Sequence, residues 1–372
     1  MVLISTLTRA LHRWTTPDST SEPTYHTPRA LRAALERERA RSDRTGTVFS
    51  FLSFTRCADR AGLERVVQAL RSRLRTTDEF GWMDEGQVAA VLLDAPASWA
   101  WMVAEDVLRD WPDGLARPAC EVFSYPDNQA RRTRGGTLRR RSTDASRRSA
   151  RHASSMKPVA RPVVHRMEPL FVQRMPTWKR SLDILGATVG LALALPLLIL
   201  SVIAVRLTSP GPAIYRQKRA GLGGVPFTIY KLRTMRLDAD AMKHELMAQN
   251  EQDGPAFKIT HDPRVTPVGR VLRTTSLDEL PQLFNVLRGN MSLVGPRPLP
   301  WEEAMACEGW QQRRLDVTPG LTGIWQVTGR ARTGFADWVR MDMRYIRARS
   351  LFQDVKLLVL TIPAVILRKG AH

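Results

Sequence analysis

Two neighbouring carboxylates in the second half of the chain, Asp278 and Glu279, are the residues best suited by type and spacing to do chemistry. They lie in the run 276–281 (SLDELP), which has the residue pattern of a helix start. In one interpretation Asp278 caps the helix, which leaves Pro281 at a first-turn position whose N–H is not needed. In another, Ser276 is the cap and Glu279 closes a capping box. Capping by itself would account for both acids.

A functional interpretation gives the same position a different use. A helix N-terminus binds anions, because its free N–H groups and its dipole both favour negative charge. Two carboxylates would repel a phosphate there unless a divalent cation lay between them. With such a cation, one carboxylate binds the metal and the other can attack phosphorus. Arg273, which precedes Asp278 by five residues, is placed to add a charge-assisted contact to phosphate.

Two further segments carry cationic side chains. Prolines flank Arg297 in the run 295–298 (GPRP) and fix its backbone, which suits a bidentate grip on phosphate. The alternative is a rigid loop with a solvated arginine. The run 230–235 (YKLRTM) alternates apolar and basic residues, as a strand with one cationic face would. Lys231 and Arg233 are therefore candidate phosphate or nucleotide contacts, although each could equally belong to a solvated face.

The run 318–327 (TPGLTGIWQV) combines a Pro-Gly turn, a second glycine, and an aromatic residue beside an amide. These residues could form a loop that holds a nucleobase. A loop that leads into a strand needs no ligand, however, and both interpretations stay open.

The elements that must position these residues include a long apolar segment. Residues 184–205 form a run of 22 without a charge, which as a helix would extend about 33 Å and cover a hydrocarbon core of about 30 Å. Pro196 lies at its middle, and Lys or Arg flanks both ends. Because cytoplasmic flanks attract positive charge, we predict a helix that enters the membrane, breaks at Pro196 and returns. A straight span and a buried core helix are the alternatives.

A second apolar helical face lies near the C-terminus and precedes Pro363. It consists of Phe352, Val355, Leu358, Val359 and Ile362. An interfacial helix and an ordinary amphipathic core helix are both compatible with it.

The whole chain has 372 residues, long enough for two domains and linkers, and a formal net charge of +20. That charge predicts a polyanionic partner: nucleic acid, the anionic face of a membrane, or phosphorylated substrates. The three cysteines have no metal-type spacing, which predicts a reducing compartment without a disulfide framework. We expect an α/β protein with a disordered segment over 1–27, a small α/β sandwich over 28–127, a basic flexible linker over 128–176, and a mainly helical α/β catalytic domain over 177–372.

Within the first folded region, hydrophobic periodicity predicts the order α-β-α-β-β-α-β. The helices are expected over 30–41, 63–74 and 99–108, and the strands over 48–54, 80–83, 88–93 and 120–125.

The chain from Lys179 to about Leu367 resembles the bacterial sugar transferase family, the monotopic polyprenyl-phosphate phosphoglycosyl transferases. The resemblance covers about half of the protein. It rests on the start at Lys179, the Pro-broken apolar helix, and the order and spacing of YKLRTM, DPR…SLDELPQL…GPRP and TPGLTGIWQ. One departure is Leu195, which stands before Pro196 where the family often has serine.

The resemblance implies a re-entrant helix in the cytoplasmic membrane, a catalytic site on its cytoplasmic face, and Mg²⁺. It implies a nucleotide-diphosphate sugar as donor, expected to be a UDP-sugar, and polyprenyl (undecaprenyl) phosphate as acceptor, in the first step of exopolysaccharide or O-antigen type assembly. It also implies a ping-pong reaction in which Asp278 is the nucleophile and Glu279, with Asp278, binds the metal. Arg273, Arg297, Lys231 and Arg233 would contact phosphate or nucleotide. Anionic lipids and a second copy of the chain are further expected partners.

The first folded region resembles a degenerate diguanylate-cyclase-like domain, on Asp78, the turn at 84–86 and the strand at 88–93. The Gly-Gly-Asp-Glu-Phe residues of that family are absent, so we expect a regulatory or dimerising domain without cyclase activity. Two rival functions remain: a membrane-tethered basic scaffold or nucleic-acid-binding protein, and a signalling enzyme for cyclic dinucleotides. The basic linker has no interleaved aromatic residues for stacking bases, so we expect no nucleic-acid partner.

Overall fold

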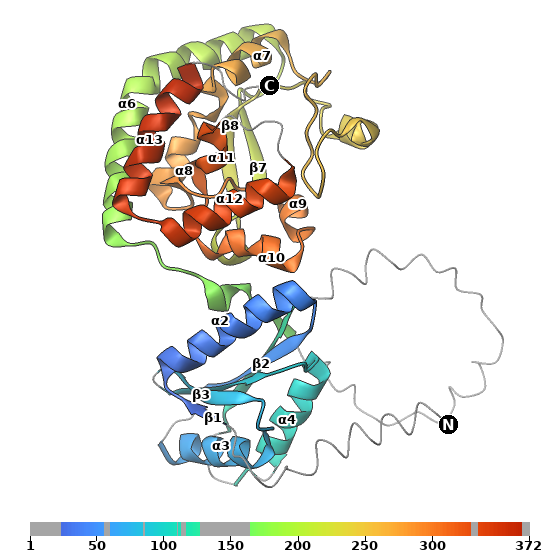
Figure 1. Ribbon diagram of the computed structural model, residues 1–372. Helices are drawn as coiled ribbons and strands as arrows, with labels where there is room; N and C mark the ends of the chain where they lie inside the picture. Colours follow the sequence, from blue (N-terminus) through green and yellow to red (C-terminus); the bar gives the residue numbers. More distant parts are fainter. Residues whose placement is uncertain are drawn as a thin grey trace, which may run out of the picture. The chain divides into compact units, whose positions relative to one another are not determined.

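The computed structural model (Figure 1) divides the chain into two compact units, Met1–Met167 and Glu168–His372. Each unit is described by itself. The residues whose structure is described are 24–55, 60–84, 86–109, 111–112, 117–126, 164–328 and 334–366. The disordered segment was predicted over 1–27. Residues 1–23 of it and Glu85 of the predicted turn lie outside the described residues, but residues 24–26 form a strand that pairs with residues 79–81, so the prediction is wrong for them.

The N-terminal unit is built on a mixed sheet whose described strands follow the order β1-β3-β4-β2-β5-β6. The strands are β1 (Thr24–His26), β2 (Phe49–Thr55), β3 (Glu79–Asp84), β4 (Gln87–Leu92), β5 (Ala119–Tyr125) and β6 (Val164–Arg166), and the helices are α2 (Pro28–Thr45), α3 (Arg60–Arg73) and α4 (Ala97–Arg109). Strand β2 is central and antiparallel to both β4 and β5. The predicted order α-β-α-β-β-α-β is confirmed.

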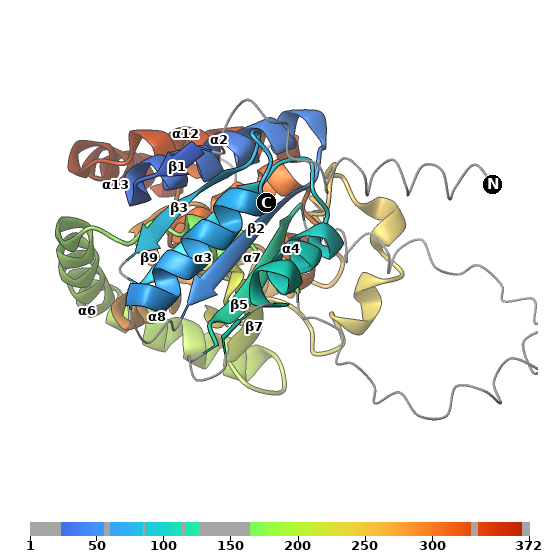
Figure 2. The same cartoon turned by 90° about the horizontal axis from the view of Figure 1, so that it is seen from below.

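Helices cover both faces of this sheet (Figures 1 and 2): α3 and α4 lie on one face, and α2 lies on the other. The core between the sheet and α3 and α4 is apolar, with Leu52, Phe54, Val66 and Leu70 fully or almost fully buried. Strand β2 is buried along almost its whole length because side chains from both of its faces pack under helices.

The predicted linker over 128–176 is wrong at its C-terminal end. Most of it, up to residue 163, lies outside the described residues. Its last residues are folded: β6 pairs with β5 in parallel, and Phe171 in the turn η3 (Glu168–Phe171) is buried in the C-terminal unit. The second unit therefore begins before Trp178, because Phe171 needs its apolar surface covered.

The C-terminal unit is mainly helical, as predicted, and its described strands form two small two-stranded sheets. The helices are α6 (Thr177–Thr208), α7 (Pro267–Thr274), α8 (Gln282–Arg288), α9 (Trp301–Met305), α10 (Gly309–Gln312), α11 (Ile324–Val327), α12 (Phe335–Ala348) and α13 (Leu351–Ile366). The antiparallel hairpin β7 (Ile214–Ala220) and β8 (Pro226–Leu232) forms one sheet, and the parallel pair β9 (Ser292–Val294) and β10 (Gly320–Thr322) forms the other. Short 3₁₀ turns connect these elements.

Helix α6 is one continuous helix of 32 residues with Pro196 inside it. Figure 1 shows it bending, with its first part along one side of the domain and its second part across one end. A proline lacks the N–H for one helical hydrogen bond and is a common cause of such a bend. Only 17% of its most apolar window is buried, whereas a core helix would be mostly buried. The core-helix alternative is therefore wrong. It is the one helix among the described residues that is long and apolar enough to cross a membrane. The re-entrant path stays a prediction.

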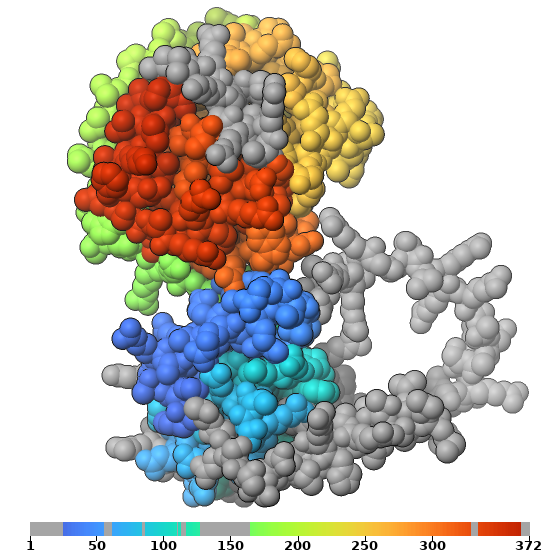
Figure 3. All heavy atoms as spheres, in the orientation of Figure 1, coloured from blue at the N-terminus to red at the C-terminus, as the bar shows by residue number. Residues whose placement is uncertain are grey.

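Helix α13 packs beside α6 through a buried polar cluster. Lys179 Nζ donates to Val294 O at 2.9 Å and to the Tyr345 hydroxyl at 3.0 Å, and it forms an ion pair with Asp354. The predicted apolar face of α13 is exposed instead of buried: Phe352 is 78% exposed and Val359 60%. The core-helix interpretation of this segment is therefore wrong. Figure 3 shows this helix, in dark red, on the surface next to α6, in green.

Candidate active site

A pocket of about 1390 Å³ lies in the C-terminal unit and collects the predicted site residues. Asp278, Glu279, Arg273, Arg297, Lys231 and Arg233 all line it. They come from α7, the following turn, β8 and its end, and the loop after β9, segments up to 66 residues apart in sequence. The tertiary structure thus brings together the two acids and the four cations that the sequence singled out.

The two acids occupy a 3₁₀ turn, η7 (Leu277–Glu279), between α7 and α8. Ser276 has a left-handed backbone (φ 57°) and reverses the chain after α7. Ser276 makes no capping hydrogen bond through its side chain. Helix α8 begins only at Gln282, with Pro281 and not Asp278 at its N-cap position. Both capping interpretations are therefore wrong: the turn directs its carboxylates away from the helix and into the pocket lining.

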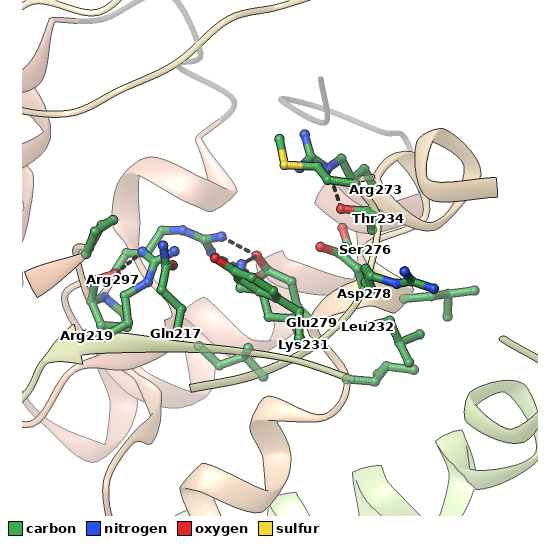
Figure 4. A pocket seen from close by; sticks show the side chains of 18 of the residues that line it. Gln217, Arg219, Lys231, Leu232, Thr234, Arg273, Ser276, Asp278, Glu279 and Arg297 are labelled. Atoms are coloured by element: carbon green, nitrogen blue, oxygen red, sulfur yellow. Dashed lines mark hydrogen bonds and ion pairs between the residues drawn. The ribbon is translucent and has the colours of Figure 1, made fainter. Parts of the chain in front are cut away.

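Glu279 is held by two cations. Lys231 Nζ lies 2.9 Å from its Oε1, Arg297 Nη1 donates to its Oε2 at 3.0 Å, and Arg297 Nη2 pairs with Oε1. Burial opposes ionisation, but the charges of Arg297 and Lys231 outweigh it and hold the pKa of Glu279 well below its usual range. Glu279 is thus ionised and fixed: Oε1 accepts from both cations, whereas Oε2 accepts from Arg297 alone and keeps a lone pair for a further ligand. Figure 4 shows it directed towards these two cations.

Asp278 is the opposite case. It is only 8% exposed, and among the described residues no hydrogen bond or ion pair to its carboxylate is formed. Burial raises its pKa to about 6, and the charge of Glu279 adds to the rise, while Lys231 and Arg273 oppose it. In Figure 4 it lies on the side of Arg273 and Thr234, away from Arg297. A buried carboxylate without a partner is reactive and free to approach a substrate atom.

Arg273 and Arg297 both line the pocket, and their contacts with phosphate stay predictions. Arg273 Nε donates to Thr234 Oγ1 at 3.0 Å, which orients the guanidinium, and burial lowers its pKa. No hydrogen bond from its two Nη nitrogens to the described residues is formed, so these nitrogens are available to an anion. Arg297 is fixed by Glu279 and can share its charge with a phosphate in the same pocket.

Arg233 corrects the prediction. Its guanidinium is buried and donates to the backbone of the segment after α6: one Nη to Pro210 O, and the other to Ser209 O at 3.0 Å and Ser209 Oγ at 2.9 Å. These carbonyls use both Nη nitrogens, so Arg233 holds the end of α6 against β8 and is not placed as a phosphate ligand. Lys231, two residues earlier, lines the pocket and pairs with Glu279, and its contact with phosphate or nucleotide stays a prediction.

Sequence reasoning missed Arg219 on β7. Burial lowers its pKa to about 10, and the nearby charge of Arg297 acts in the same direction. Its Nη1 donates to Pro298 O at 2.7 Å, which fixes the loop that carries Arg297. The basic run 216–219 after the apolar segment could have indicated this residue. The same run is also typical of the cytoplasmic flank of a membrane helix, and that interpretation hides its place in the site.

The run 318–327 also contributes to the pocket. Trp325 and Gln326 of α11 line it, and the Trp325 ring stacks on Trp338 of α12 with centroids 4.6 Å apart and planes 7° apart. The segment continues as a short helix after β10 instead of the predicted strand.

The described residues contain no group of three His, Cys, Asp or Glu side chains that could hold a metal ion. The available donor set is the carboxylate pair Asp278 and Glu279. Such a set fits Mg²⁺ in its usual substrate-assisted mode, in which one or two carboxylates, substrate phosphates and waters complete the shell. It does not fit a metal site made by protein ligands alone.

Comparison with a solved structure does not test the predicted cyclase-like domain. The structure compared is the diguanylate cyclase SiaD of Pseudomonas aeruginosa in complex with its activator SiaC. The alignment covers 33% of this chain and 54% of the matched chain, at 20% identity and a TM-score of 0.22. A likeness at that level carries no argument about fold or activity, and the cyclase-like domain stays a prediction.

Sequence relatives cover the C-terminal unit. The chain is 44% identical over 194 residues to the galactosyl transferase CpsE of Streptococcus agalactiae. The aligned segment covers 52% of this chain and 43% of that protein. It is 41% identical over 198 residues to the exopolysaccharide production protein ExoY of Rhizobium meliloti, covering 52% of this chain and 88% of that protein. It is 43% identical over 208 residues to the UDP-glucose:undecaprenyl-phosphate glucose-1-phosphate transferase of Caulobacter vibrioides, covering 52% and 72%.

A sequence model of one family, described as bacterial sugar transferase, matches residues 174–368. This match spans more than half of the chain and contains every residue of the pocket. The resemblance predicted from the sequence is thereby confirmed, and the chain belongs to the bacterial sugar transferase family.

Proposed function

We propose that this protein transfers a sugar-1-phosphate from a nucleotide-diphosphate sugar to polyprenyl phosphate, with Asp278 as the nucleophile. The observation that carries the proposal is the contrast within the acid pair. Glu279 is ionised and held by Lys231 and Arg297, whereas Asp278 is buried without a partner in the same cationic pocket.

In the first step, a carboxylate oxygen of Asp278 attacks the sugar-bearing phosphorus of the donor. The new bond joins this oxygen to phosphorus, the bridging P–O bond of the diphosphate breaks, and its electron pair leaves with the nucleoside monophosphate. The enzyme then carries an aspartyl phosphosugar. Arg273 and Arg297 are positioned to compensate charge on the phosphate oxygens, and fixed cations of this kind stabilise the transition state without reorganisation.

In the second step, a phosphate oxygen of the polyprenyl phosphate attacks the same phosphorus. The bond to Asp278 breaks, the carboxylate is regenerated, and a polyprenyl diphosphate sugar is released. Covalent catalysis thus divides one difficult transfer into two displacements at the same residue. Such a product would begin the assembly of an exopolysaccharide or O-antigen type glycan.

We propose that Asp278 and Glu279, together with the donor phosphates, hold Mg²⁺. When bound, the ion supplies Lewis-acid stabilisation of the charge that develops on the phosphate oxygens. Glu279 keeps its negative charge for this role because Arg297 and Lys231 lower its pKa. In the free chain, those two cations neutralise it.

The substrates follow from the relatives and the pocket. The Caulobacter relative is named for UDP-glucose and undecaprenyl phosphate, and a Salmonella typhimurium relative is an undecaprenyl-phosphate galactose phosphotransferase. We propose a UDP-sugar as donor and undecaprenyl phosphate as acceptor. The exposed apolar surfaces of α6 and α13 support attachment to the cytoplasmic membrane, with α6 re-entrant at Pro196 and the pocket on the cytoplasmic side.

The covalent step can be tested directly. Full-length protein in lipid nanodiscs is mixed with UDP-glucose or UDP-galactose and Mg²⁺ without acceptor, quenched, and analysed by intact mass and peptide mapping. We expect an added hexose phosphate on the peptide that contains Asp278, released when undecaprenyl phosphate is supplied. Asp78→Asn in the N-terminal unit is the matched control and should retain the adduct. An adduct on another residue, or full turnover by Asp278→Asn, would contradict the proposal.

A further inference from the structure

Two polar atoms on adjacent residues of α11 are buried without a hydrogen-bond partner. They are Nε1 of Trp325 and the side-chain oxygen Oε1 of Gln326, and both residues line the pocket that holds Asp278. Buried side-chain polar atoms in native proteins are paired in the large majority of cases, because an unpaired one loses its hydration without compensation. A donor and an acceptor left unpaired on adjacent residues of the pocket lining therefore each indicate a missing partner.

The structure fixes what each of these groups can offer. Gln326 Nε2 donates to Leu321 O at 3.1 Å, which sets the amide orientation and leaves Oε1 as a pure acceptor. The Trp325 ring is held by its stacking on Trp338 at 4.6 Å, and its Nε1–H can only donate. The pair thus presents one donor and one acceptor with little side-chain entropy left to lose on binding.

The surroundings of Trp325 are apolar. Trp325 packs on a buried cluster that includes Ala256, Leu299 and Phe335. Such a wall suits a flat aromatic ligand edge more than a sugar, whose several hydroxyl groups would each require a partner. The cations that suit a diphosphate, Arg297 and Lys231, line the same pocket.

We infer that Trp325 and Gln326 form the nucleobase subsite of the donor, an inference that rests on the proposed function and deepens it. The ring N–H of uracil donates to Gln326 Oε1, and a neighbouring ring carbonyl accepts from Trp325 Nε1. The base occupies the α11 end of the pocket, and the diphosphate extends from it towards Arg297 and Asp278. Each bond supplies the partner that the buried atom lacks.

The test measures binding rather than turnover. Isothermal titration in the Asp278→Asn background, with full-length protein in nanodiscs, compares UDP, UDP-glucose and inorganic pyrophosphate. Trp325→Phe keeps the stacked ring and removes only the N–H, and Gln326→Met removes the acceptor. We expect each to weaken UDP and UDP-glucose by the same factor, about 3- to 10-fold for one neutral hydrogen bond, with pyrophosphate binding unchanged. Trp310→Phe, which packs on the same cluster outside the pocket lining, is the matched control and should bind all three normally.

Three results would overturn the inference. Unchanged UDP affinity in both variants would mean that these atoms bind only water. A loss for UDP-glucose but not for UDP would assign them to the sugar, and an equal loss for pyrophosphate would show a disturbed phosphate site. Because pyrophosphate binding also reports correct folding and each of the two variants is informative alone, a folding defect in one leaves the other decisive. Catalysis plays no part in this measurement, so its outcome is separate from the role of Asp278.

Discussion

Each unit of the protein contains a buried aspartate whose pKa is raised to about 6 by burial, Asp78 in the N-terminal unit and Asp278 in the C-terminal unit. Their surroundings differ. Asp78 is 1% exposed and accepts hydrogen bonds from the backbone N–H groups of Arg75 and Leu93, both at 3.1 Å. Asp278 accepts none from the described residues and lines a large cationic pocket.

The comparison shows that a perturbed pKa does not by itself identify a functional carboxylate. Desolvation acts on any buried acid, whether it fastens a turn or attacks a substrate. The distinguishing feature is where the oxygens are used. Those of Asp78 close the turn before β3 and tie it to the end of β4, whereas those of Asp278 remain available.

The largest expected effect separates the two aspartates by activity. Asp278→Asn should lower phosphosugar transfer by about 10³-fold or more, because it removes the attacking oxygen's charge. Asp78→Asn should leave transfer within a few-fold of the parent. Release of UMP from a UDP-sugar, with undecaprenyl phosphate in nanodiscs, measures both. Comparable losses of transfer activity in the two variants would contradict the distinction drawn between the two aspartates.

The next effect concerns the cations. Arg297→Met should lower kcat/KM by about 10²- to 10³-fold, since it removes a fixed charge from the phosphates and leaves Glu279 paired with Lys231 alone. The matched ion pair in the N-terminal unit joins Arg37 and Glu79 at 3.2 Å, with the arginine 64% exposed. Arg37→Met should leave kcat/KM unchanged, as expected for a solvated pair. A small effect of Arg297→Met would remove this residue from the site.

The two aspartates should rank in the opposite order when the free energy of unfolding is measured instead of activity. Asp78→Ala leaves the N–H groups of Arg75 and Leu93 buried without acceptors and should lower the free energy of unfolding by about 2–4 kcal/mol.

Asp278→Ala removes a carboxylate without such partners. Because its folded-state pKa lies above the unfolded value of 3.8, its ionisation costs stability as pH rises through about 6. The alanine variant should therefore be as stable as the parent near pH 4 and more stable at pH 7.5. Thermal and denaturant unfolding at both values measures this, and strong destabilisation by Asp278→Ala would show a structural role.

The smallest effect is the pH dependence of the parent protein. Asp278 must be ionised to attack, and its pKa is raised, so kcat/KM should be constant above about pH 6 and fall about tenfold per pH unit below it. Glu279 should not contribute in that range because its pKa is lowered. Initial rates between pH 4.5 and 8 provide the test. A profile flat to pH 4.5 would mean that Asp278 is stabilised by a partner.

Much of the fold could be predicted from the sequence. Helix α4 and strand β5 appear close to their expected bounds because their apolar periodicity reflects burial against one sheet. The bend-prone apolar helix α6 was predicted from an uncharged run and Pro196. The predicted caps failed because capping patterns are local, whereas the turn that follows Ser276 depends on its packing against β8 and α6.

The family, the acid pair Asp278 and Glu279, and the proline-flanked Arg297 could be predicted from residue type and spacing, because these are local properties of the chain. Which acid is paired and which is free depends on the fold, since Glu279 meets Lys231 across 48 residues of chain. The tertiary structure also assigned Arg233 to the end of α6 and added Arg219 to the site. A cation's partner is set by which segments the core brings together, and burial then makes that pairing strong.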